Sequence, residues 1–345
     1  MKSSSSPPRT TTPTSPESPD LGRRLSRLVR TGSPRVVARA ARRELVWRRH
    51  EADAARGIRA GKRVLAGPFL GEVGFELLYW IPVLRRILAG VDRERVTILT
   101  RGGAGAWYRD FAGDAIDVLD LVPPEGYLNE LVERRRREGN TKQFFPDELD
   151  KRLTQLALER IGDAVVIHPL VMYSRMRFVL ELMQPVEAVT RIGEYRELLL
   201  EDRRLPPGCP ADYVAVKLYF SDSFPDDEAS RALVARVLGE LAERTDVVVL
   251  TSGRQLDEHR EWVPEGARIH DSSSWVTPQD NLAVQTAVVA GARELVATYG
   301  GFSYLGPMLG LPTRALWTQE VFQRVHLDVL RAAYPDASYE LVGPS

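Results

Sequence analysis

Residues 62–88, KRVLAGPFLGEVGFELLYWIPVLRRIL, decide the fold. The apolar run 62–67 predicts a short buried strand, a glycine-rich loop follows it, and the remainder predicts an apolar helix. A second strand is predicted shortly afterwards, at 95–100. A strand, a helix and a second strand in this order form the repeating unit of a parallel sheet that helices cover on both faces.

The same alternation continues along the chain, with one interruption. The interruption is the breaker-rich segment 205–210, LPPGCP, where we expect a domain boundary. The N-terminal side predicts strands at 116–122 and 164–168 and helical segments over 127–160 and 170–205. The C-terminal side predicts strands at 213–220, 246–250, 268–270, 294–298 and 313–317, and helices at 228–244, 281–292 and 302–309. We therefore expect an α/β fold of two Rossmann-like domains, 61–205 and 206–345, that face each other across a cleft.

Residues 1–60 differ in composition from the rest of the chain. Residues 1–20 are mostly serine, threonine and proline, which predicts a disordered tail. Residues 21–60 predict an Arg-rich helical segment, split into two helices at 32–34. Between Gly22 and His50 there are ten arginines and one acid, Glu44. Two interpretations stay open: an interfacial helix in which 22–50 contacts anionic membrane, or a helix pair packed on the first domain with its arginines in water.

The overall composition excludes several classes of protein. The chain has 345 residues with equal numbers of basic and acidic side chains, 47 of each, so it carries no overall charge that would attract nucleic acid. Cys209 is the single cysteine, which excludes an internal disulfide and fits a reducing compartment. The histidines lack metal-ligand spacing and no Asp-x-Asp pair occurs, so we expect no essential metal. Without an apolar signal sequence or spanning segment, we expect a cytoplasmic protein.

The loop after the first predicted strand carries two glycines, Gly71 and Gly74, and two acids, Glu72 and Glu76. Ligands of parallel α/β sheets bind at this edge, and glycines let an acceptor approach the backbone closely. A carboxylate there can act as a general base that removes the proton of an attacking hydroxyl. The alternative is an ordinary helix start, at which acids are favoured by the helix dipole.

A second loop, at 298–304, follows a predicted strand of the C-terminal domain. Its candidate donor-binding residues are Tyr299, Gly300, Gly301, Ser303 and Tyr304. Backbone N–H groups at the start of the following helix can hold a diphosphate. The alternative is a tight strand-to-helix connection without a ligand.

Other candidates follow strands or begin helices. Lys217 ends the first strand of the C-terminal domain, where a cation can neutralise a leaving diphosphate; it can equally be a surface lysine. Ser221 or Ser223 can add hydroxyl donors. The further donor-binding candidates are Ser252 and Gly253 at a base-binding turn and Asn281 at a helix start. His168, at a strand end, is a candidate for acceptor binding together with Gly71 and Gly74. Ser252, Gly253, Asn281 and His168 each also have an ordinary structural interpretation.

Together these segments resemble the ADP-heptose heptosyltransferase group of GT-B glycosyltransferases. The family's Gly-Asp, followed by a helix with a proline and then Leu-Arg, is matched by Gly71-Glu72, Pro82 and Leu84-Arg85. The family's Asp-Thr-Gly-Pro-Met-His-Leu and Ala-Leu-Gly-x-Pro-Thr occupy the places of residues 299–305 and 308–313. The first loop also resembles uncharacterised bacterial GT-B-like proteins found among polysaccharide genes. In fucosyltransferases of this fold a basic residue has the place of Lys217.

The resemblance implies an inverting, metal-independent glycosyltransferase that moves a sugar from a nucleotide-sugar co-substrate, without another cofactor, to a glycan or lipid-linked acceptor. Glu72, or second Glu76, takes the acceptor proton, and Lys217 and residues 300–304 stabilise the nucleoside diphosphate. The family's aspartate, threonine and histidine are Tyr299, Gly300 and Tyr304 here, so the donor's identity does not transfer. Two other functions stay open: a nucleotide-sugar epimerase and a non-catalytic scaffold.

Overall fold

The computed structural model describes residues 34–138, 142–180, 186–221, 224–252, 260–263, 265–318 and 324–343. By its internal contacts the chain divides into two units, residues 1–48 and 49–345. The described part of the first unit is helical and belongs to α2 (Pro34–Arg59). The tail predicted at 1–20 and the helix break predicted at 32–34 fall largely outside the described residues.

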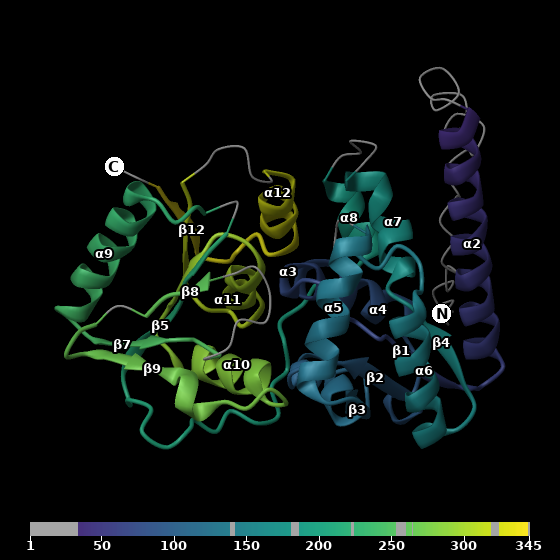
Figure 1. Ribbon diagram of the computed structural model, residues 1–345, viewed down its shortest axis with the longest axis horizontal. Coiled ribbons are helices and arrows are strands. Elements are labelled where there is room, and N and C mark those ends of the chain that lie inside the picture. Colours follow the sequence, from purple (N-terminus) through teal and green to yellow (C-terminus); the bar gives the residue numbers. More distant parts are fainter. Residues whose placement is uncertain are drawn as a thin grey trace, which may run out of the picture. The chain divides into compact units, whose positions relative to one another are not determined.

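The second unit contains two parallel sheets, and Figure 1 labels most of their strands. The N-terminal sheet has the order β3-β2-β1-β4, with β1 (Arg63–Ala66), β2 (Val96–Thr100), β3 (Asp114–Asp117) and β4 (Ala164–Ile167). The C-terminal sheet has the order β12-β11-β10-β5-β7-β9, with β5 (Tyr213–Lys217), β7 (Asp246–Val249), β9 (Ile269–Asp271), β10 (Leu295–Thr298), β11 (Thr313–Leu316) and β12 (Tyr339–Val342). All these pairs are parallel, which confirms the predicted α/β class.

Both sheets are doubly wound. When the strands of each sheet are numbered in chain order, the N-terminal sheet reads 3-2-1-4 and the C-terminal sheet reads 3-2-1-4-5-6. The direction of winding reverses between β1 and β4 in the first sheet and between β5 and β10 in the second. Ligands of such sheets bind beyond the carboxyl ends of the strands at this reversal point.

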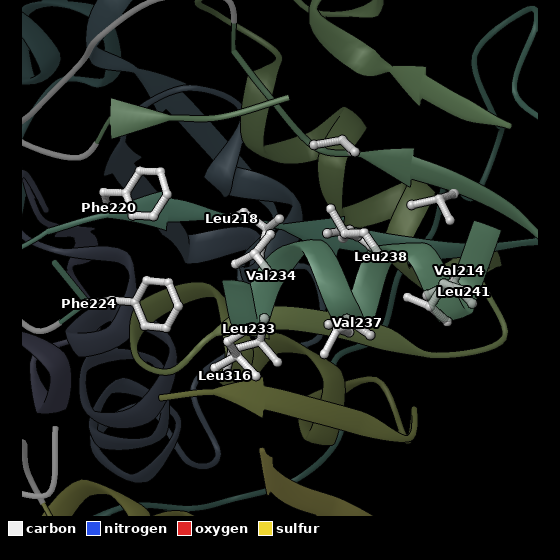
Figure 2. Packing of buried hydrophobic residues seen from close by; sticks show 14 residues of the cluster. Val214, Leu218, Phe220, Phe224, Leu233, Val234, Val237, Leu238, Leu241 and Leu316 are labelled. Atoms are coloured by element: carbon white, nitrogen blue, oxygen red, sulfur yellow. The ribbon is translucent and has the colours of Figure 1, made fainter. Parts of the chain in front are cut away.

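Helices cover the sheets with apolar faces. Side chains of α5 (Pro124–Glu138) and α6 (Glu148–Ile161) pack with Leu65, Leu99 and Ile116 of the N-terminal sheet. Helix α9 (Glu228–Ala242) packs its buried leucines and valines against β5 and β7, as Figure 2 shows. Fully burying such a side chain contributes about 1.5–3 kcal/mol, so both clusters stabilise their sheets substantially.

The helix after the first loop is built in three pieces. They are the short turn α3 (Val73–Phe75), a π-helical turn at Glu76–Trp80 and α4 (Ile81–Ile87). The remaining helices of this part are α7 (Leu170–Leu180) and α8 (Glu187–Ile192).

In the C-terminal part α10 (Asn281–Gly291) follows β9, and α12 (Arg324–Ala333) precedes β12. The predicted helix 302–309 is a 3-10 turn at Gly301–Tyr304 followed by α11 (Leu305–Met308).

Three predicted elements differ from the structure. The strand expected at 116–122 ends at Asp117, because the Asp117 carboxylate accepts from the Leu119 amide and starts a 3-10 turn. The predicted helical segment 170–205 contains no helix beyond Ile192; there the buried Arg85 guanidinium donates to the carbonyl groups of Arg196 and Glu197 and holds the chain extended. The strand predicted at 213–220 breaks after Lys217, and β6 (Tyr219–Phe220) pairs instead with β8 (Arg260–Glu261), antiparallel.

Candidate functional site

The loop after β1 is held tightly against the end of β2. The Phe69 amide donates to the Leu99 carbonyl at 2.9 Å, and Gly67 has a φ of +133°. A Cβ atom at Gly67 would lie 2.2 Å from the same Leu99 oxygen, so only glycine fits here. This close packing positions the following residues, Gly71 and Glu72, at the carboxyl edge of the sheet.

Gln143 forms hydrogen bonds with the backbone of the same loop. Its side-chain oxygen accepts from the Leu70 amide at 2.8 Å, and its nitrogen donates to the Pro68 carbonyl at 2.7 Å. The same nitrogen donates to Asp150 at 2.9 Å, and both side chains are buried. Because an unpaired buried amide costs about 1–3 kcal/mol, Gln143 fixes the backbone conformation that leads into Glu72.

His168 is buried and is linked to Gln143 through their shared partner Asp150. Its Nδ1 accepts from the Leu170 amide at 3.1 Å, and its Nε2 therefore carries the hydrogen that is donated to Asp150 at 3.2 Å. Burial opposes ionisation of Asp150, but the hydrogen bond with His168 and the charge of Arg134 hold the pKa of Asp150 below its usual value. His168 therefore supports the loop through Asp150 and Gln143, and its buried position corrects the prediction that it binds the acceptor.

Glu76 is fully buried and engaged on both carboxylate oxygens. One oxygen accepts from the Thr100 hydroxyl at 2.7 Å and the Tyr108 hydroxyl at 2.5 Å, and the other pairs with Arg101 at 2.5 Å. Arg101 also donates to the Gly71 carbonyl at 2.6 Å. Burial and the neighbouring carboxylate raise the pKa of Tyr108, so its hydroxyl stays a donor. Glu76 is therefore an anchor of the loop and is not accessible to an acceptor hydroxyl.

Glu72 is the exposed acid of the loop. It occupies the N-cap position of α3 but makes no side-chain capping hydrogen bond there. Burial first, and the charge of Glu72 second, raise the pKa of Tyr173. Of the two predicted bases, Glu72 alone has the exposure that proton removal from a bound hydroxyl requires.

The loop after β10 makes a tight turn with most of its side chains internal. Gly300 has a φ of +124°, and the Ser303 hydroxyl donates to the Gly300 carbonyl at 2.7 Å. The same hydroxyl lies 2.7 Å from the Tyr339 hydroxyl, and both Ser303 and Tyr304 are buried. The Tyr299 ring is half-buried and lies edge-on to Tyr304, with centroids 6.3 Å apart. Ser303 and Tyr304 thus shape the turn, whereas Gly300 and Gly301 are partly exposed.

The two glycine-rich loops meet. A Cβ atom at Gly74 would lie 2.8 Å from the Gly301 Cα and 3.2 Å from the Tyr304 ring, so the backbones are in direct contact. Sequence reasoning selected both loops independently, one from each predicted domain. The fold brings them together at the reversal points of the two sheets.

Asn281 is held by contacts within its helix. Its side-chain oxygen accepts from Gln285 at 2.6 Å, and it is buried. The next amide, that of Leu282, donates to the Gly102 carbonyl at 2.6 Å, beyond the end of β2. The start of α10 is thus capped by the N-terminal part of the chain, which leaves Asn281 with a structural role.

Lys217 takes part in an ion pair at the carboxyl ends of β5 and β7. Its ammonium group donates to Glu261 at 2.5 Å and to the Leu250 carbonyl at 3.0 Å, and it lies 5.8 Å from the centre of the Phe302 ring. Ser252 donates to the second oxygen of Glu261, from its amide at 2.8 Å and its hydroxyl at 3.0 Å. Two predicted donor-binding residues, Lys217 and Ser252, therefore converge on one carboxylate.

The remaining predicted residues are less informative. The Ser221 amide donates to the Phe224 carbonyl at 2.9 Å, and the Phe224 amide donates to the Ser221 carbonyl at 3.1 Å. Ser223 and Gly253 lie outside the described residues.

An aromatic cluster joins the two parts beside the glycine loops. His326 of α12 forms a hydrogen bond through Nδ1 with the Tyr79 hydroxyl and packs edge-on against Phe75, with centroids 5.5 Å apart. Burial, and to a lesser extent the charge of Lys142, lower the pKa of His326 to about 4. The imidazole is therefore neutral at physiological pH.

Across the residues that the structure describes, no three histidine, cysteine, aspartate or glutamate side chains gather as a metal ion would require. In the same residues, no helix combines the length and apolar character needed to cross a membrane.

Sequence reasoning missed Gln143, Arg101, Glu261 and His326. Arg101 could have been found, because it directly follows the predicted strand 95–100 at the edge where ligands bind. Glu261 lies 44 residues from Lys217 in the sequence, and the antiparallel pairing of β8 that brings them together is not predicted by any local sequence pattern. Gln143 and His326 are single polar residues whose importance arises only from tertiary contacts.

No protein-family model and no curated protein matches the chain. Among solved structures it is similar to E. coli ADP-heptose LPS heptosyltransferase II, with 11% identity, coverage of 81% of this chain and 90% of that chain, and a TM-score of 0.40. A glycosyl transferase family 9 structure from Veillonella parvula has 15% identity, coverage of 82% and 86%, and a TM-score of 0.42. The UDP-GlcNAc 2-epimerase from Methanocaldococcus jannaschii has 10% identity, coverage of 81% and 88%, and a TM-score of 0.34.

Proposed function

We propose that this chain is a glycosyltransferase of the GT-B type that moves a sugar from a nucleotide-sugar to a glycan or lipid-linked acceptor. The observation that carries the proposal is the meeting of the two glycine-rich loops at Gly74 and Gly301. Glu72 lies two residues before this contact, and Phe302, one residue after it, lies over Lys217. A base and an anion-binding cation thus flank the same contact.

In the proposed reaction, the acceptor hydroxyl oxygen attacks the anomeric carbon and its proton passes to Glu72. The bond between that carbon and the diphosphate oxygen breaks, and the electron pair leaves with the nucleoside diphosphate. Lys217 and Ser252 stabilise the charge that grows on the leaving oxygen. Attack on the face opposite the leaving group inverts the anomeric configuration.

A second candidate is a non-catalytic scaffold of the same fold. The observation in its favour is that Ser303, Tyr304 and Asn281, predicted to bind the donor, are buried and engaged within the protein. The accessible Glu72 and the partly exposed Lys217 favour the enzyme.

The test is incubation of the full chain with UDP-, GDP-, ADP-, CMP- and dTDP-sugars, with and without candidate acceptors, preceded by a thermal-shift screen of the free nucleotides. A ligand at 100 times its dissociation constant stabilises a protein by about 2.7 kcal/mol. Release of nucleotide that depends on acceptor supports the transferase, and isomerised sugar identifies an epimerase. If no donor binds or is turned over, the non-catalytic scaffold is the remaining candidate.

We further propose peripheral contact with anionic membrane through 22–50, which would suit a lipid-linked acceptor. In the described portion of this segment Leu45 and Val46 are 70% and 37% exposed, beside exposed arginines. Leu45→Asp should reduce co-sedimentation with phosphatidylserine vesicles, and Val132→Asp, at a residue 51% exposed on α5, is the matched control. Equal sedimentation of both variants and the unaltered chain would exclude this contact.

A further inference from the structure

Three donors converge on the Glu261 carboxylate in a way that resembles a site built for an anion. They are the Lys217 ammonium at 2.5 Å, the Ser252 amide at 2.8 Å and the Ser252 hydroxyl at 3.0 Å. An ammonium, a backbone amide and a hydroxyl are the groups with which proteins bind phosphate oxygens. A carboxylate satisfies them in this structure.

The donors and the carboxylate come from different parts of the fold. Lys217 and Ser252 follow β5 and β7, neighbouring strands of the parallel sheet. Glu261 belongs to β8, which lies outside that sheet and pairs with β6 over two residue pairs. The donors are thus fixed at the ligand-binding edge, and the carboxylate is carried to them on a small antiparallel pair.

The Lys217 ammonium has contacts that do not depend on Glu261. It donates to the Leu250 carbonyl at 3.0 Å and lies 5.8 Å from the centre of the Phe302 ring. These contacts hold the cation in place when the carboxylate leaves. The pair is also within reach of solvent, with the Lys217 and Glu261 side chains 12% and 20% exposed.

We propose that Glu261 occupies the phosphate site of the resting protein and that a diphosphate binds by displacing it from Lys217 and Ser252. The inference rests on the proposed function and adds to it a residue that sets donor affinity. The Ser252 amide and hydroxyl each donate one hydrogen, so they cannot serve the carboxylate and a phosphate at the same time, and the two anions also repel each other beside Lys217. A nucleoside without phosphate does not compete with Glu261.

The experiment measures binding of inorganic pyrophosphate, and of any nucleoside diphosphate found in the nucleotide screen, to the full chain by calorimetry. Glu261→Gln removes the competing charge and keeps the side-chain length. Glu261→Asp keeps the charge on a shorter side chain, and Lys217→Met removes the cation. The matched control is Glu294→Gln, because Glu294 pairs with Arg314 at similar exposure, 24% and 25%, beside β10 at the opposite edge of the same sheet.

Glu261→Gln should tighten pyrophosphate binding by about tenfold, the size of one charge-assisted contact no longer opposed. Glu261→Asp should fall between this variant and the unaltered chain, and Glu294→Gln should match the unaltered chain. Lys217→Met should abolish the gain, also in combination with Glu261→Gln. Thermal unfolding of each variant confirms that it is folded.

Weaker binding in folded Glu261→Gln, by as much as in Lys217→Met, would overturn the proposal, because Glu261 would then position the lysine rather than compete with the ligand. Absence of pyrophosphate binding in every variant would overturn it as well. A gain for pyrophosphate without turnover of any nucleotide-sugar would remove the proposed function and leave the anion site. Turnover of a nucleotide-sugar without tighter pyrophosphate binding in Glu261→Gln would support the proposed function and exclude competition by Glu261.

Discussion

The loop after β1 and the proposed anion site after β5 and β7 both lie at the carboxyl edge of a parallel sheet, but they hold their charges differently. In the first, Glu76 is fully buried and its two oxygens are engaged by Thr100, Tyr108 and Arg101. In the second, Glu261 is held at a partly exposed position by groups that would serve a phosphate equally well. The arrangement around Glu76 suits a fixed structural element, and the arrangement around Glu261 suits the exchange of one anion for another.

The difference assigns separate tasks to the two edges. A base must be held in one geometry, because a small displacement of a reacting group has a large effect on rate. A donor site must bind and release a charged product in every cycle. We therefore expect substitutions at the first edge to reduce turnover or stability and substitutions at the second to change affinity.

The largest effect is expected for Glu72→Gln. It should reduce turnover by roughly 10²–10⁴-fold with diphosphate binding unchanged, because the amide cannot accept the acceptor proton. The measurement is the rate of acceptor-dependent nucleotide release. Glu148→Gln is the control, since Glu148 is also an exposed acid in the first turn of a helix. A similar loss in both variants would point to a helix-dipole effect and remove Glu72 as the base.

Glu76→Gln should destabilise the protein by about 3–5 kcal/mol, because it leaves the Arg101 guanidinium, whose side chain is only 13% exposed, without its charge partner. Chemical denaturation measures the change. The control is Glu133→Gln, which breaks an ion pair with Arg136 whose side chains are 60% and 73% exposed and should cost less than about 1 kcal/mol. Equal stability of the two variants would mean that the Glu76 network is not the closed anchor described above.

Much of the fold was predictable from the sequence, because buried parallel strands are short apolar runs that alternate along the chain with helical periodicity. The two glycine loops were predictable for the same reason, since a strand followed by glycines and a helix start is a local pattern. What could not be predicted is which acids are buried. Glu72 and Glu76 lie on one loop, and only the tertiary contacts of Arg101 and Tyr108 make the second inaccessible. The extended segment after Ile192 was missed likewise, because Arg85 holds it from a distant helix.

Gln143→Met should reduce turnover by about 10- to 100-fold with little change in KM, because it frees the loop backbone without removing Glu72. Amide hydrogen exchange at Leu70, which donates to Gln143, should accelerate while the α9 amides stay protected. The matched control is Gln285→Met, a buried glutamine that contacts Asn281 and not the loop. Unchanged exchange at Leu70 in the Gln143 variant would show that the loop is fixed by Arg101 and β2 alone.

The smallest effect is expected for His326, at the contact between the two parts. Its pKa is about 4 in the folded protein, against 6.5 for an ordinary histidine, because of burial first and Lys142 second. Between these two pH values the unfolded chain binds a proton that the folded chain does not. The contribution of the neutral His326 imidazole to the free energy of unfolding is therefore complete above pH 6.5 and is lost as pH falls towards 4.

The loss amounts to about 1–3 kcal/mol in all, and His326→Gln should remove this part of the decline in Tm between pH 7 and pH 4.5. Tyr79→Phe is the comparison, because it removes the hydroxyl partner but leaves the imidazole buried. If burial is the main cause, Tyr79→Phe keeps the decline. A decline that disappears in Tyr79→Phe, or persists in His326→Gln, would mean that the pH dependence comes from other groups and that the contact at α12 does not respond to pH.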